Sequence, residues 1–410
     1  MRYALLLSLD LIALIGCNTD NDAITGTQSI RVEIVAPTTT GTVDQRLPDT
    51  QRTLTVNLTA LDANHDIDTS FSDNVRVYAQ FLGTLTPDID QMPLVTIPMV
   101  DGQATGKVIT LPASVLGPTT LWFDNGTGLG ADYQYGVVGG TSDTLWYRDP
   151  FIADLQTPRS ETAVDALTIT PLTDKQISVS DSRYGARGRL VVTSVFSQGY
   201  TVSDVQCADS NGTPPCVAAA YDHAMVFTFS AARDQFGHLL EVGRTIKKFN
   251  GGLSEFNGLT EVGFPRTFGP ELEGEAPVVN VARLPAPVRV DAETTVDADT
   301  WFDALSTPDG IINFERNEAG AIEILNAKVC PTDDDYDTYK QWKIDPFAAG
   351  TCTGNKLISV ITQGTDFTTD PKTLVGRVLP RIVGIVRPVN IGSFNVWIIY
   401  PRGASDVTLQ

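Results

Sequence analysis

The sequence predicts an all-β protein that consists of one β-sandwich followed by two small closed barrels. The first observation behind this prediction is a series of short alternating or apolar runs, separated from one another by Pro, Gly, Asn and Asp. The second is an internal repeat in the second half of the chain. The third is a set of cysteines that fall into pairs close in sequence, which is typical of small disulfide-stapled units.

The N-terminal residues have the pattern of an export signal. Residues 3–15 follow a single Arg2 and are too few for a stable membrane anchor, which needs about 20 apolar residues. The run ends in Leu-Ile-Gly-Cys at 14–17, which resembles the lipobox of bacterial lipoproteins, although Asp10 interrupts the apolar run. The resemblance implies cleavage before Cys17 and attachment of acyl chains such as palmitate to that residue. An ordinary secretory signal with a coincidental cysteine is the alternative.

This resemblance also predicts where the protein is located. Asn18, rather than aspartate, follows Cys17, and in Gram-negative lipoproteins this permits sorting to the outer membrane. We therefore expect a lipid-anchored protein of the bacterial cell envelope, on the periplasmic or the surface face of the outer membrane. Residues 18–28 are short and polar and are expected to be a tether.

The remaining cysteines indicate disulfides, because an even set in an exported chain is usually oxidised. Four cysteines allow three pairings. We favour Cys207–Cys216 and Cys330–Cys352, since each pair closes one local loop. A metal site is the rival interpretation, but the spacing lacks CxxC pairs and the chain has only 3 histidines.

Residues 29–158 are predicted to form the sandwich, because they contain short strand-like runs separated by turn residues. The phrase ALDANHDIDTSFSDNVRVYAQ, followed by DGQATGKVITLP, resembles bacterial immunoglobulin-like modules, with His65-Asp66 in place of the usual Gly-Asn. The resemblance implies an immunoglobulin-like sandwich. The same turn contains an oxygen-rich set that suits calcium, although an EF-hand loop would need glycine at Ile67 and a plain solvated turn is the alternative. That set is Asp62, Asn64, Asp66 and Asp68.

The internal repeat predicts the two barrels. Both copies contain Val-Gly-Arg, then Phe-Asn, then an aromatic residue followed by Pro-Arg. These groups stand at 242–244, 256–257 and 264–266 in the first copy and at 375–377, 394–395 and 400–402 in the second. Upstream β runs bring each copy to five strands, which suits a small closed barrel. Gly384 lies where a barrel strand must coil, and Asn257-Gly258 is a strong hairpin signal.

Three phrases carry a further resemblance. The first copy reads YTVSD at 200–204, LEVGR at 240–244 and EFNGLTE at 255–261, and the second ends in VWIIYPRGASDV. These phrases resemble the OB-fold domains that accompany secreted bacterial nucleases and occur in exported lipoproteins, in which aspartate usually stands where this chain has Arg244. The resemblance implies OB-like five-stranded barrels at 185–268 and 311–408. Residues 269–310, rich in Pro, Glu and Asp, are predicted to be an acidic linker.

No motif in the sequence indicates catalysis. The chain has no GxSxG elbow, HExxH, Walker loop or GxGxxG before a helix. His223 follows Asp222, but a residue at the end of a strand is the simpler interpretation. We therefore expect a protein that is not an enzyme.

Charge and aromatic residues guide the choice of partner. The chain has 49 acidic and 29 basic residues and a net charge of −20, which disfavours nucleic acid. OB barrels bind polymers through aromatic platforms and basic grooves, and oligosaccharide is the polymer we favour. The second barrel places Arg387 beside other arginines and aromatic residues, although core packing also explains such aromatics. The predicted ligand face is Arg377, Arg381, Trp397 and Arg402.

A string of aspartates at 333–337 is the second candidate for calcium, through Asp333, Asp335 and Asp337. The EF-hand pattern fails there as well, because Thr338 stands where glycine is needed. A solvated turn between the first two strands of the second barrel is the alternative.

Together these observations predict a non-catalytic lipoprotein of the cell envelope that acts as a binding or structural module. An envelope protein or an oligosaccharide is the expected partner. Two alternatives stay open at this point, an accessory subunit of an extracellular hydrolase or nuclease and a calcium-stabilised adhesin-like module.

Overall fold

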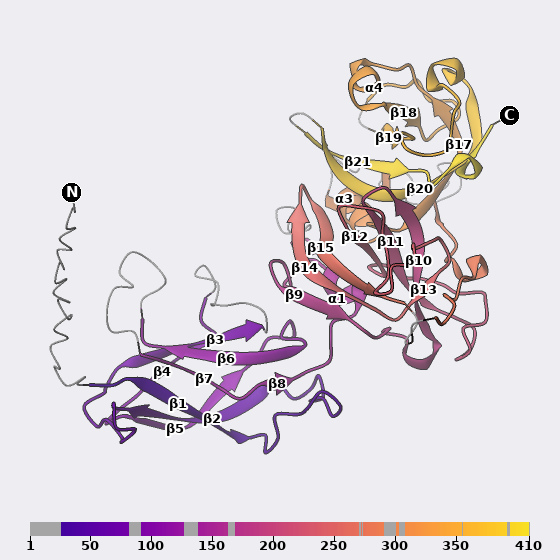
Figure 1. The fold of residues 1–410 in the computed structure, drawn as a ribbon. Helices are drawn as coiled ribbons and strands as arrows, with labels where there is room; N and C mark the ends of the chain where they lie inside the picture. The colour runs from indigo at the N-terminus through magenta and orange to yellow at the C-terminus, as the bar shows by residue number, and fades with distance from the viewer. Residues whose placement is uncertain are drawn as a thin grey trace, which may run out of the picture.

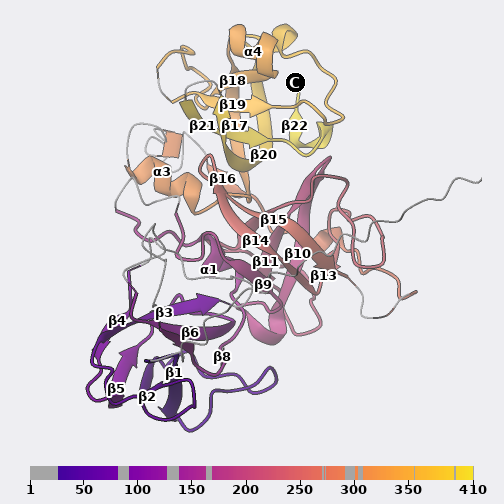
Figure 2. The same ribbon diagram turned by 60° about the vertical axis from the view of Figure 1, so that its left-hand side comes forward.

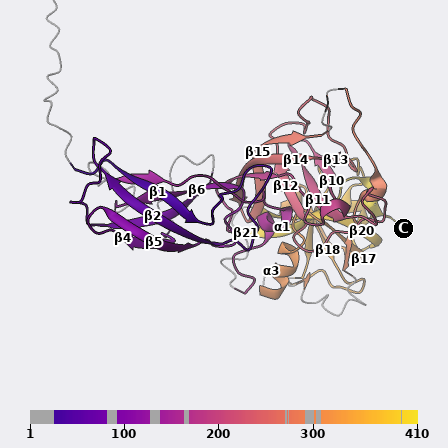
Figure 3. The ribbon, with the colours of Figure 1, turned by 90° about the horizontal axis from the view of Figure 1, so that it is seen from below.

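The structure confirms the predicted all-β class, with 43% of residues in strands and 10% in helices. The computed structural model describes residues 26–81, 92–126, 138–162, 169–269, 272, 274–290, 301–302, 308–354, 356–391 and 394–409. They form a sandwich, a first barrel (barrel 1) and a second barrel (barrel 2) in chain order (Figure 1). Barrel 1 lies between the other two parts, and the sandwich extends away from the barrels (Figures 2 and 3). None of the helices in the described part of the chain combines the length and apolar character that crossing a membrane requires.

The sandwich consists of two antiparallel sheets whose inward side chains form one core. One sheet has the order β1-β2-β5, and its strands are β1 (Ser29–Ala36), β2 (Thr53–Leu61) and β5 (Gln103–Thr110). The other contains β4 (Val95–Pro98), β3 (Asn74–Phe81), β6 (Pro118–Asp124), β7 (Gly139–Thr141) and β8 (Leu145–Trp146). Alternate residues such as Leu54, Val56 and Leu58 are buried, which is the period-two pattern of a sheet with one wet face.

Barrel 1 has the strand order β13-β10-β11-β12-β15-β14-β9. Its strands are β9 (Gln176–Val179), β10 (Gly188–Phe196), β11 (Gly199–Gln206), β12 (His223–Phe227), β13 (Thr245–Ile246), β14 (Lys248–Phe256) and β15 (Leu259–Phe268). Only Lys247 separates β13, which pairs with β10, from β14, which pairs with β15. These two segments therefore act as one bent strand that brings the ends of the sheet together.

Barrel 2 repeats this arrangement and closes completely, because β20 pairs with both β17 and β21. Its ring consists of β17 (Ala321–Val329), β18 (Gln341–Asp345), β19 (Ile358–Ile361), β20 (Val378–Ile391) and β21 (Phe394–Tyr400). Two short strands extend the sheet, β16 (Val288–Val290) and β22 (Val407–Thr408). In both barrels the third and fifth strands of the ring are parallel, as β12 with β15 and β19 with β21. This is an OB-like topology.

Two glycine-based predictions are confirmed. Asn257 and Gly258 have φ values of 54° and 81° and form the tight turn between β14 and β15. Both central residues of a type I′ hairpin need positive φ, which explains this pair. At Gly384, where β20 coils from one partner strand to the other, a β-carbon would lie 2.8 Å from Cβ of Ile399. Only glycine permits this close approach.

Short helices complete the fold. They are α1 (Ile152–Gln156), α3 (Pro308–Glu315) and α4 (Asp334–Tyr339), with 3-10 turns at η2 (Gly185–Arg187), η3 (Val281–Arg283), η4 (Pro371–Leu374) and η5 (Ala404–Asp406). Ile152 and Leu155 of α1 pack into the core of barrel 1, and Phe314 of α3 packs into that of barrel 2.

One sequence-based expectation needs correction, and the predicted linker is seen to pack on the barrels. The aspartate string was expected to be a turn, but most of it forms α4. Acidic residues in the first turn stabilise a helix because they interact favourably with its dipole. The predicted acidic linker contacts both barrels in its described part. The backbone N–H of Thr245 donates a hydrogen bond of 2.9 Å to the carbonyl oxygen of Val278, and the side-chain Nε of Arg283 donates one of 2.8 Å to the carbonyl oxygen of Gly212. Further along, β16 joins the sheet of barrel 2.

Candidate ligand-binding site

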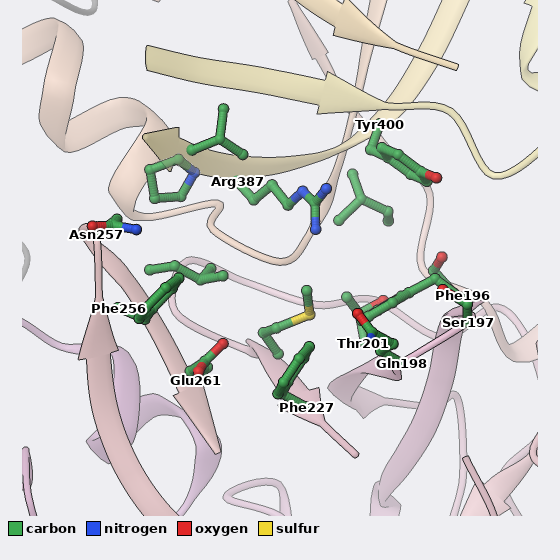
Figure 4. Close-up of a pocket in the computed structure, with 16 residues that line it drawn as sticks. Phe196, Ser197, Gln198, Thr201, Phe227, Phe256, Asn257, Glu261, Arg387 and Tyr400 are labelled. Atoms are coloured by element: carbon green, nitrogen blue, oxygen red, sulfur yellow. The ribbon is translucent and has the colours of Figure 1, made fainter. Parts of the chain in front are cut away.

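A pocket of about 390 Å³ lies between the outer face of barrel 1 and β20 of barrel 2 (Figure 4). Its volume is in the range of roughly 300–1,000 Å³ that ligand pockets occupy. On barrel 1 the pocket is bounded by two tight turns. The β10–β11 turn contributes Ser197 and Gln198, and the β14–β15 turn contributes Asn257. In OB folds the equivalent loops flank the ligand-binding face.

The floor of the pocket consists of outward side chains of β11, β12 and β15. On β12 these are Met225 and Phe227, while Val226 between them points into the barrel core and is fully buried. Met225 is paired with Glu261 of β15 in the parallel register. The two-residue period of a strand therefore places a thioether, an aromatic ring and a carboxyl group side by side on one surface.

Barrel 2 provides the opposite wall through Arg387 and Tyr400, which belong to the neighbouring strands β20 and β21. The guanidinium carbon of Arg387 lies 4.9 Å from the ring centroid of Tyr400, in a cation–π contact. Figure 4 shows the guanidinium group extending into the space between the two barrels. Burial lowers the pKa of Arg387, and within the described residues its buried Nε has no hydrogen-bond partner.

These contacts define what the pocket can do chemically. Arg387 is half-buried and lines the pocket, so its guanidinium group can donate hydrogen bonds to an acceptor oxygen of a ligand. Phe227 and Phe256 offer aromatic surfaces, and the amides of Gln198 and Asn257 stand at the rim. Burial raises the pKa of Glu261. The described lining residues include no histidine or cysteine, and thus no nucleophile–base pair built on them.

The predicted ligand face of barrel 2 is not assembled, and that expectation is corrected. Arg377 is exposed before β20 begins, whereas Arg381 forms an ion pair of 3.2 Å with Glu323. Trp397 is only 9% exposed and packs in the barrel core. Arg402 donates hydrogen bonds of 2.9 and 2.8 Å to the carboxylate of Asp406. Because β20 bends and changes partner strands, Arg381 and Arg387 face different neighbours.

The calcium candidates are also not assembled in the described part of the chain. Asp333 pairs with Lys343 at 2.6 Å and Asp337 with Lys372 at 3.0 Å, so the two carboxylates turn to separate cations. The side chain of Asp335 lies outside the described residues. In the sandwich turn, Oδ1 of Asp62 accepts hydrogen bonds from the backbone of the same turn. No group of three or more His, Cys, Asp or Glu among the described residues could hold a metal ion.

Both predicted disulfides are confirmed, Cys207–Cys216 in barrel 1 and Cys330–Cys352 in barrel 2. Cys17 lies outside the described residues. His223 is buried, and its Nδ1 lies 2.7 Å from the hydroxyl oxygen of Ser203. Burial lowers the pKa of His223 to about 4, while the Asp222 carboxylate instead binds Arg183, so the two do not form an acid–base pair.

The residues of barrel 1 that line the pocket were missed by sequence reasoning. Their alternation could have identified them as outward-facing, but nothing in the local sequence shows that barrel 2 covers them. The chain matches no protein-family model, no characterised protein and no solved structure. The functional argument therefore rests on the geometry of this pocket.

Proposed function

We propose that the protein is a non-catalytic binding module that holds an oligosaccharide in the pocket between its two barrels. The observation that carries this proposal is the half-buried guanidinium group of Arg387, which lines the pocket and stands among aromatic rings. A sugar ring fits such a surface because its C–H bonds pack on aromatic faces and its hydroxyl groups form hydrogen bonds. The position between the two loops of an OB-like face supports the same ligand class.

Nucleic acid fits this pocket less well. Binding a phosphate backbone requires several cationic side chains, whereas Arg387 is accompanied here by Glu261. The net charge of −20 adds a repulsive long-range field. A neutral N-acetylated sugar is a better match, because its methyl group suits Met225 and Leu259 and its carbonyl oxygen suits Arg387.

We further propose that the module works in the bacterial cell envelope, anchored through acylated Cys17 at the outer membrane. The lipobox-like residues 14–17 support the anchor. The two disulfides support an oxidising compartment, since such bonds are rare in the cytosol of mesophiles.

Calorimetric titration tests the binding proposal. Hexa-N-acetylchitohexaose should bind the wild-type chain, and Arg387→Met should weaken binding about tenfold or more, because a charge-assisted hydrogen bond is lost at nearly constant volume. The control is Arg31→Met, an exposed arginine on β1 of the sandwich, which should bind like wild type. Equal affinity of Arg387→Met and wild type would contradict the proposed site. No binding to the wild type would contradict the proposed ligand.

A further inference from the structure

Three phenylalanines form a contiguous cluster on the outside of barrel 1, which we call the phenylalanine ladder. The ring centroids of Phe227 and Phe229 are 4.5 Å apart, and those of Phe229 and Phe264 are 4.8 Å apart. Phe229 is 53% exposed and Phe264 is 84% exposed. A barrel gains little from two large apolar rings in water, so their position needs another explanation.

The backbone at the two exposed rings is strained. Phe229 and Phe264 have φ values of 58° and 49°, in the left-handed region that bulky residues rarely adopt. Phe264 also precedes Pro265, and a residue before proline favours extended backbone. It lies where the register of β14 and β15 shifts, and such bulges re-aim side chains near functional sites. The strained backbone directs these rings into solvent, where they add little to the stability of the fold. Such strain is typical of residues that contact a ligand.

The ladder is continuous with the candidate site. Phe227 both lines the pocket between the barrels and touches Phe229. Its partner across the strand pair is Gly263, which has no side chain to interrupt the surface. At the other end, Phe264 lines a second pocket of about 310 Å³, between barrel 1 and sandwich residues that include Asp149. The polar side chains of Gln176 and Asn250 also line that pocket.

We infer that the phenylalanine ladder is a second part of the binding site, on which further sugar rings of a linear glycan stack as the chain leaves the pocket between the barrels. This inference rests on the proposed function. Its occupant is a glycan because the apolar rings connect two pockets that are both lined by polar side chains, and sugars combine apolar faces with polar rims. A membrane or an apolar protein surface would have to cover the half-buried carboxyl group of Glu261 beside the ladder.

The double variant Phe229→Gly/Phe264→Gly tests the inference. Glycine adopts positive φ without strain, so the variant should fold and its unfolding temperature should be equal to or above that of the wild type. Its affinity for hexa-N-acetylchitohexaose should fall about tenfold, while its affinity for N,N′-diacetylchitobiose, which occupies the pocket alone, should not change. The control Leu239→Ala removes an exposed side chain elsewhere on barrel 1 and should leave both affinities unchanged.

The outcomes separate the inference from the proposed function. If the double variant binds the hexasaccharide like wild type while Arg387→Met does not, the inference is wrong and the pocket stands. If the wild type binds neither sugar, the proposed ligand fails and the inference fails with it. If the double variant instead loses binding to phosphatidylglycerol vesicles, or changes from dimer to monomer in sedimentation, the ladder contacts a membrane or a second copy and the inference is overturned.

Discussion

The backbone N–H of Thr260 in barrel 1 donates a 3.0 Å hydrogen bond to Oε1 of Glu318, in the turn that leads into barrel 2. The hydroxyl of the same threonine donates one of 2.8 Å to Glu255. Glu315 of α3, which is 1% exposed, joins Glu255 and Glu318 in a cluster of three glutamates. Burial raises the pKa of Glu255 to about 7, and burial together with repulsion from Glu255 raises that of Glu315 to about 9. Burial, together with repulsion from Glu315 and Glu255, raises the pKa of Glu318 as well.

This cluster predicts that the fold loses stability as the pH rises. A carboxyl group with a raised pKa holds its proton more tightly in the folded than in the unfolded chain, so its contribution is fully favourable below the ordinary value of 4.5. That contribution is lost as the pH rises to about 7 for Glu255 and about 9 for Glu315. Thermal unfolding measured across this interval should show a falling unfolding temperature.

The variant Glu318→Gln should flatten this dependence. Glutamine still accepts the hydrogen bond of Thr260 but carries no charge, so the free energy of unfolding at alkaline pH should rise by at least about 1.4 kcal/mol, the equivalent of one pKa unit. The variant Glu241→Gln changes an exposed carboxylate of the same barrel and serves as the control. A Glu318→Gln protein with the pH profile of the wild type would exclude the cluster as the source.

The buried ion pair between Arg244 and Asp234 predicts a second stability effect. Both side chains are fully buried, and Arg244 also donates a 2.9 Å hydrogen bond to the carbonyl oxygen of Leu239. Burial raises the pKa of Asp234, but hydrogen bonds from His238 and Arg244 more than offset this and hold it below its ordinary value. Arg244→Met should therefore leave a buried carboxylate without its arginine partner and cost about 3–5 kcal/mol of stability in urea unfolding.

A second substitution distinguishes this explanation from loss of packing. Arg244→Met combined with Asp234→Leu removes both charges, so it should recover a large part of the lost stability. If the loss in free energy of unfolding of the double variant equals the sum of the losses of Arg244→Met and Asp234→Leu, the effect comes from packing and not from an unpaired charge.

The fold was predictable because its signals are local. Alternation along a strand, the turn chemistry of Asn257-Gly258 and the close spacing of Cys207 and Cys216 each depend on neighbouring residues. The ligand site was not predictable because it depends on which surfaces of two barrels meet. Trp397 was expected in a ligand face at the surface. Its ring centroid instead lies 5.6 Å from that of Phe314, which belongs to a helix distant in sequence. No local pattern separates Arg387, which extends into the pocket, from Arg381, which pairs with Glu323.

The disulfides predict a third stability effect, one in each barrel. Cys330 and Cys352 are separated by 22 residues and Cys207 and Cys216 by 9. Closing such loops restricts the unfolded chain and stabilises the fold by about 3 kcal/mol each. The variant Cys330→Ser/Cys352→Ser should lose about that amount in urea unfolding. Reductant should then lower its stability further only through the remaining bond, and an equal response of wild type and variant to reductant would contradict this assignment.

Acylation of Cys17 is the last prediction. A cell that expresses the full chain and is fed an alkyne fatty acid should attach the label to this protein, and the label should be lost in Cys17→Ser. Because each buried methylene adds about 0.8 kcal/mol, several acyl chains hold a protein firmly on a membrane. The wild-type chain should therefore sediment with membranes, and Cys17→Ser should be released from them. The matched control Cys207→Ser should keep the label, since that thiol belongs to a disulfide inside barrel 1. Equal labelling of wild type and Cys17→Ser would show that the acyl chains, and with them the anchor, are attached elsewhere.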